Sequence, residues 1–115
     1  MTPEQRESRI RRLVSAAKAV LSLQVGLAVG ANRIIGILYH LGPEFRNAHP
    51  IFDQFIRSVP PVVPIGGARL LWAPDALMKT DKVLAKTENK YRKSVLVECI
   101  QIIASSAKSV GETTV

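Results

Sequence analysis

The sequence predicts an all-α fold, a small bundle of three to four helices with one long C-terminal helix. Start and stop signals flank several segments in which apolar residues recur at helical spacing. These segments cover about 3–21, 27–41, 50–58 and 74–104. A chain of 115 residues, of which 47% are hydrophobic, is long enough to bury a core without metal or disulfide support. We therefore expect one helical domain over residues 1–115.

The first helix has a clear N-terminal signal. Thr2 suits the N-cap, Pro3 the first helical position, and Gln5 follows the cap by three residues, which together form a capping box. An apolar stripe then follows at helical spacing: Ile10, Leu13, Val14, Ala17, Val20 and Leu21. A helix over about 3–21 follows from this pattern.

The second helix, at about 27–41, contains two glycines in its interior. Gly30 and Gly36 each lower helical propensity by roughly 1 kcal/mol relative to alanine. A glycine in a helix also allows another helix to approach closely. Gly42-Pro43 then ends the segment.

A loop-rich connection is expected at about 42–73. Within it, apolar residues from Ile51 to Ile56 predict a short helix at about 50–58, which Pro60-Pro61 must end. The long helix then begins at Pro74, with Trp72 and Leu77 at the positions of a hydrophobic staple.

The long helix changes character along its length. Its first part has five lysines on one face: Lys79, Lys82, Lys86, Lys90 and Lys93. The segment 95–103 is apolar on nearly every side, so we expect the helix to be exposed at its start and buried at its end, with a frayed C-terminus at about 106–115.

The predicted long helix exceeds the size of a compact domain. At ~1.5 Å per residue it is roughly 47 Å long, whereas a domain of this size is about 34 Å across. One end must therefore project, bend or pair with another chain, and the exposed middle, about 82–92, is the first place to look for a partner. Self-association through the side that carries Leu77, Leu84 and Tyr91 is one hypothesis.

No catalytic or metal-binding pattern is evident. His40 and His49 do not form a metal-spaced set with the single cysteine, Cys99, and the motifs of phosphate loops, dinucleotide sites and serine hydrolases are missing. We expect a non-enzymatic protein with no catalytic residues, cofactor or metal. Cys99 lies in an apolar stretch and no apolar leader is visible, so a cytoplasmic location without a membrane association is expected.

The candidate interaction surface consists of cationic side chains, because the net charge is +7. Its members are Lys79, Lys82, Lys86, Lys90, Lys93, Arg33 and Arg69. The five lysines could follow a phosphate backbone, but no aromatic residues alternate with them, so a solvated helix face is the favoured interpretation. Arg33 and Arg69 are more simply explained as structural ion pairs or carbonyl caps.

Two stretches resemble a family of small bacterial proteins that carry a domain of unknown function. The first is 23–35, with a glycine-containing turn at Val25–Gly30, and the second is 64–77, continuing to Glu88, Tyr91, Arg92 and Cys99. The resemblance implies no activity. Val29 stands where the family usually has an acidic residue, and 57–63 replaces a more acidic loop.

The function expected from these observations is protein binding. A small accessory or immunity-like protein that binds and blocks a partner is the most concrete form. The alternative is a basic nucleic-acid-associated protein that uses the five lysines together with Arg6, Arg9 and Arg12.

Overall fold

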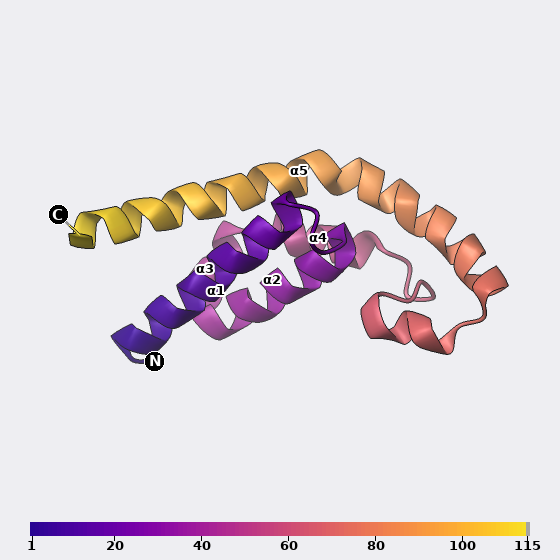
Figure 1. The fold of residues 1–115 in the computed structure, drawn as a ribbon, viewed down its shortest axis with the longest axis horizontal. Helices are drawn as coiled ribbons and strands as arrows, with labels where there is room; N and C mark the ends of the chain where they lie inside the picture. Colours follow the sequence, from indigo (N-terminus) through magenta and orange to yellow (C-terminus); the bar gives the residue numbers. More distant parts are fainter. Residues whose placement is uncertain (115) are drawn as a thin grey trace.

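The computed structural model describes the backbone of residues 1–114 and the side chains of residues 1–106, and every regular element in this range is helical. The elements are α1 (Pro3–Leu21), α2 (Leu27–Leu41), α3 (Pro43–Ala48), α4 (Ile51–Ser58), the 3-10 helix η1 (Gly66–Leu71) and α5 (Pro74–Thr114). Figure 1 shows α5 arching over a body formed by α1 to α4. The predicted all-α bundle with a long C-terminal helix is confirmed.

Helix α1 begins at the predicted capping box. The Gln5 backbone N–H donates to Thr2 Oγ1 at 3.1 Å, and the Thr2 N–H donates to Gln5 Oε1 at 3.0 Å. Both bonds satisfy amides that have no partner inside the helix. The helix ends at Leu21, after which a short turn leads the chain into α2.

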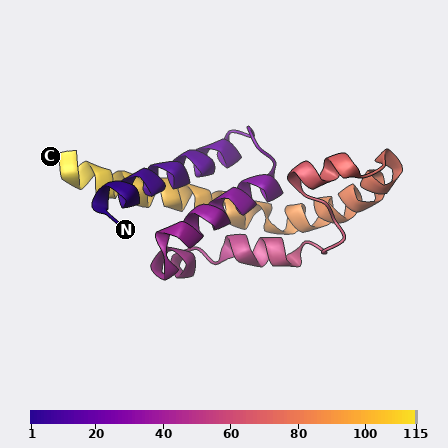
Figure 2. The same cartoon turned by 90° about the horizontal axis from the view of Figure 1, so that it is seen from below.

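Helices α1 and α2 run in opposite directions and pack closely against each other (Figure 2). Gly30 makes this approach possible, because a Cβ atom at that position would overlap Cγ2 of Val20 and lie 3.2 Å from Cγ2 of Val25. Gly36 has a different environment, with no heavy atom within 4 Å of the position that a Cβ would take. The close approach expected from glycine is therefore seen at Gly30 and has no counterpart at Gly36.

The connection at 42–73 is more ordered than a loop, and this corrects the predicted count of three to four helices. Gly42 has a φ of 114°, which turns the chain sharply, and Pro43 then opens α3 at its first position. Gly42-Pro43 ends one helix and also starts the next. The second unpredicted element, η1, lies between the predicted helices α4 and α5.

One contiguous core lies between α1, α2, α4 and the second half of α5. Phe52 and Phe55 of α4 are fully buried in it, and Tyr91 of α5 packs on Phe55 with ring centroids 5.6 Å apart. The core residues contributed by α5 are Val95, Cys99 and Ile102.

Helix α5 differs from its prediction in two respects. It continues to Thr114 rather than ending near residue 104, and the fraying predicted at about 106–115 falls largely on residues whose side chains lie outside the described range. The segment 95–103 is also buried on one face only, because Val97 and Ile100 remain 42% and 56% exposed. Among the described residues no helix packs on the outer side of α5, so these two side chains face away from the body.

The molecule is elongated, as the excess helix length predicted. Its extents are 55 × 26 × 24 Å. The first part of α5 carries no buried residue before Val95 and runs beyond the body, where η1 packs beneath it (Figure 1). We call residues 62–90 the arm.

Candidate interaction surface

The predicted cationic surface does not come together as one site. All five lysines are exposed on the outer face of α5, whereas Arg69 lies on η1 and Arg33 lies on α2 in the body. Among the described side chains, none of the five lysines forms an ion pair. Lys90 Nζ lies 5.6 Å from the ring centre of Tyr91.

Arg69 fastens the arm. Its guanidinium donates from Nη1 to Asp81 Oδ1 at 2.5 Å and from Nη2 to Asp81 Oδ2 at 3.0 Å, a two-pronged pairing that ties η1 to α5. The hydrogen bond from Arg69 holds the pKa of the Asp81 carboxyl below its usual value. The structural role that the sequence favoured for Arg69 is therefore the one observed.

Large apolar side chains of the arm remain exposed. Leu70 and Leu71 are each 89% exposed, Met78 is 65% exposed and Trp72 is 37% exposed. We call these four residues the apolar tip. Trp72 and Leu77 occupy the predicted staple positions, but neither belongs to the core or packs against it. The Arg69–Asp81 pair thus ties η1 to α5, and the four side chains of the apolar tip are left for contacts outside the chain.

The side of α5 predicted for self-association makes contacts within the chain. Leu84 and Tyr91 pack against the chain's own core, and the Tyr91 hydroxyl lies 2.8 Å from Ser58 Oγ. The sequence could not show this, because α4 approaches α5 only in the folded chain. The apolar tip replaces that side as the exposed apolar part of the arm.

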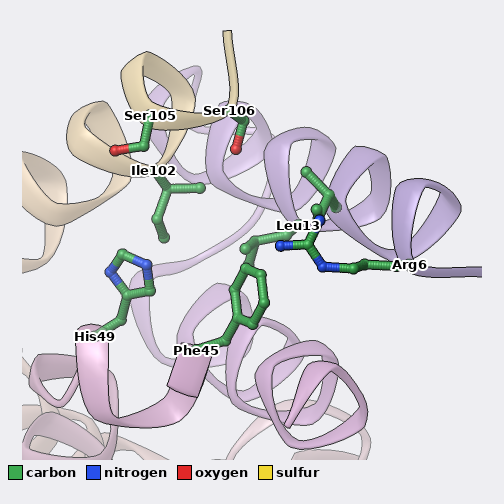
Figure 3. Close-up of a pocket in the computed structure, with 8 residues that line it drawn as sticks. Arg6, Leu13, Phe45, His49, Ile102, Ser105 and Ser106 are labelled. Carbon is green, nitrogen blue, oxygen red and sulfur yellow. The ribbon is translucent and has the colours of Figure 1, made fainter. Parts of the chain in front are cut away.

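A small cavity of about 110 Å³ lies between α1, α3 and α5 (Figure 3). The Arg6 guanidinium carbon lies 5.4 Å from the ring centre of Phe45 at one side of it, and His49 closes the other side. His49 Nδ1 and Glu98 Oε1 are 2.5 Å apart, and both side chains are more than four-fifths buried. This pair links the α3–α4 corner to α5.

The His49–Glu98 pair resembles two thirds of a hydrolase triad, since a carboxylate there orients an imidazole. Ser105 and Ser106 line the same cavity, but no hydrogen bond joins either hydroxyl to His49 among the described side chains. Ile102 projects between Ser105 and His49 in Figure 3. The geometry fits a structural hydrogen bond between distant segments, and the sequence had no local signal for a pair so far apart.

Cys99 is fully buried in the core. Burial, with a smaller contribution from the Glu98 charge, raises the pKa of its thiol to about 11. The thiol therefore stays protonated near neutral pH, which is the unreactive state. It packs as a small apolar side chain, as the sequence predicted.

The described residues contain neither a metal-ligating cluster nor a helix suited to a membrane. No three metal-ligating side chains lie together there. Within the same range, every helix is either too short or too polar to cross a bilayer.

Comparisons with known proteins give no relative. The chain matches no protein-family model, no curated protein and no solved structure. The resemblance to a bacterial domain of unknown function therefore stays a prediction.

Proposed function

We propose that this protein is non-enzymatic and acts by binding another protein through the apolar tip, as a small accessory or immunity-like protein. The observation that supports it is the exposure of Leu70, Leu71, Trp72 and Met78 on an arm that projects from the body. Three of these residues are consecutive in the chain, and exposed apolar patches on small proteins typically mark interaction sites.

A partner that covered the apolar tip would remove its side chains from water. A leucine side chain contributes about 1.5–3 kcal/mol when it is fully removed from water. Leu70 and Leu71 gain almost none of this in the fold, because 89% of each residue stays exposed. Trp72 adds an aromatic side chain of the type that dominates binding energy in protein interfaces. The apolar tip therefore still exposes apolar surface whose burial by a partner would stabilise a complex.

The experiment is a capture from the cells that make the protein, with Leu70→Glu/Leu71→Glu as the test variant. The matched control is Leu23→Glu, because Leu23 is 81% exposed but lies in the α1–α2 turn on the body. A partner retained by the wild type and the control but lost by the test variant supports the proposal. Sedimentation equilibrium of the purified protein shows whether that partner is a second copy. Equal capture by all three proteins would overturn the proposal.

The cytoplasm is the compartment we propose for this interaction. A single buried thiol needs no oxidising environment, and burial keeps it protonated.

A second candidate function is nucleic-acid binding by the five exposed lysines, supported by their position on one outer face of α5. The arginines predicted to assist are engaged by the chain itself in two cases: Arg6 stacks on Phe45, and Arg9 Nη1 donates to the His40 carbonyl at 3.0 Å. A mobility-shift assay at low salt tests this function with Lys82→Gln/Lys86→Gln. Binding that weakens in this variant and with added salt supports it, since phosphate contacts release counterions.

A further inference from the structure

A groove runs between α1 and α2, the two helices that lie beside each other in Figure 2. It consists of two adjoining hollows of about 430 and 200 Å³, which share Arg12 and Ile37. We call it the α1–α2 groove. Its floor is made of short or apolar side chains, among them Ala16, Ala19 and Ile37.

The walls of the groove are cationic. Arg9, Arg12 and His40 line one end, and Arg33 lines the other, whereas no carboxylate lines either hollow. Helix α2 has no acidic residue, and on α1 Glu7 is paired with Arg11 at 2.8 Å. Among the described side chains, neither Arg12 nor Arg33 forms an ion pair. Both guanidinium groups are therefore available to an anionic partner.

Gly36 gives a second, independent indication. It lies one helical turn from both Arg33 and His40 on the exposed surface of α2, next to residues that line the groove. Glycine at a mid-helix position costs roughly 1 kcal/mol relative to alanine. At Gly30 the packing of α1 explains the cost, but at Gly36 nothing in the chain lies within 4 Å of a Cβ. The missing side chain leaves room for something outside the chain.

We propose that the α1–α2 groove binds an acidic amphipathic helix of a partner protein. The occupant's carboxylates pair with Arg12 and Arg33, whose planar guanidinium groups accept two-pronged pairing. Its apolar side chains cover Ala16, Ala19 and Ile37. The short floor residues and Gly36 allow a third helix to approach to the 8–10 Å axis separation of packed helices. This surface is separate from the apolar tip and does not depend on it.

The lining favours a protein segment over a nucleic acid. Single-stranded nucleic acids are bound through aromatic side chains on which bases stack, and no aromatic residue lines either hollow except the His40 imidazole. An apolar floor gives nothing to a phosphodiester backbone but is suited to leucine and alanine. From Arg33 to His40 the groove extends along eight residues of α2, a rise of roughly 10 Å, which is two turns of a bound helix.

The experiment uses a fluorescent helical peptide of three heptads, with glutamate on one face and leucine and alanine on the other, and an oligonucleotide of equal charge. The full chain is titrated with each, and amide chemical shifts locate the binding. We expect the peptide to shift residues of the groove and Arg12→Gln/Arg33→Gln to weaken it by roughly tenfold per arginine, the effect of about 1.4 kcal/mol each. Gly36→Gln changes no charge and should weaken the peptide by obstructing the groove.

Lys82→Gln/Lys86→Gln is the matched control, because it removes the same charge from the outer face of α5. Thermal melts show that each variant is folded. Peptide binding that needs the two arginines and is unchanged in the control supports the proposal. Equal losses in both double variants would show nonspecific attraction, and tighter binding of the oligonucleotide in the groove would show a nucleic-acid site. Either result, or the lack of peptide binding, overturns the proposal.

Discussion

The two interior glycines of α2 provide a matched pair of substitutions in one helix. Gly30 and Gly36 are both helical, and replacing either by alanine removes the same backbone flexibility from the unfolded chain. Their surroundings differ: a Cβ at Gly30 overlaps the buried Val20 side chain, while a Cβ at Gly36 meets nothing within 4 Å. We expect alanine to stabilise the protein at Gly36 and to give no gain, or a loss, of stability at Gly30.

The magnitudes follow from helix propensity and packing. Each Gly→Ala change contributes about 1 kcal/mol to helix stability. At Gly36 this gain stands alone, so Gly36→Ala stabilises by about 1 kcal/mol. At Gly30 the overlap with Val20 adds an overpacking cost of about 1–3 kcal/mol, so Gly30→Ala ranges from neutral to about 2 kcal/mol less stable.

Urea unfolding followed by circular dichroism measures both variants against the wild type. Gly36→Ala should also raise Tm by about 4 °C, since this is the shift expected per kcal/mol for a domain of this size. The reasoning is refuted if Gly30→Ala stabilises as much as Gly36→Ala, because α1 and α2 would then not be in close contact at Gly30. Unchanged m-values would show that the variants differ in stability and not in the compactness of the unfolded state.

Three further predictions concern the side-chain pairs and the thiol. Arg69→Gln should return the pKa of Asp81 toward its usual value in an NMR titration, and an unchanged Asp81 pKa would contradict the pairing. Because the wild-type carboxyl has a lowered pKa, the stability that this pair contributes is present above the unfolded-state pKa of Asp81. It is lost as the pH falls through the folded-state pKa. His49→Ala should lower the free energy of unfolding by about 1–3 kcal/mol, because it leaves the mostly buried Glu98 without its partner. A double-mutant cycle with Glu98→Ala should show coupling between the two residues, whereas additive losses would argue against the hydrogen bond. Cys99 should resist iodoacetamide at neutral pH in the folded protein and react after denaturation, because burial raises the pKa of its thiol to about 11. Stoichiometric labelling of the native protein would contradict this, since it would show that the core around Cys99 opens to the reagent.

The elements with strong local signals could be predicted from the sequence. Thr2, Pro3 and Gln5 located the start of α1, and Pro74 located the start of α5, because caps and prolines act through residues close in the chain. Helix α3 was missed because Gly42-Pro43 was interpreted only as a stop. The exposed Val97 and Ile100 were predicted to be buried because a wholly apolar segment gives no information about which neighbours exist.

The candidate surfaces were less predictable, because packing assembles them from separate segments. Arg12 and Arg33 line the same groove only because α2 lies along α1, and Arg69 reaches Asp81 only through the fold of the arm. The charges of these side chains were visible in the sequence. Their partners were not.

Helix α5 belongs to both the body and the arm, and this gives one continuous helix two levels of stability. Around Val95, Cys99 and Ile102 its backbone opens only when the core is disrupted, whereas in the arm it depends on the Arg69–Asp81 pair and on exposed hydrogen bonds. Amide exchange should therefore be slow in the body and become faster toward Pro74 along the same helix. A protein bound to the apolar tip would slow exchange in the arm while leaving the core unchanged, so the helix itself can report where a partner sits.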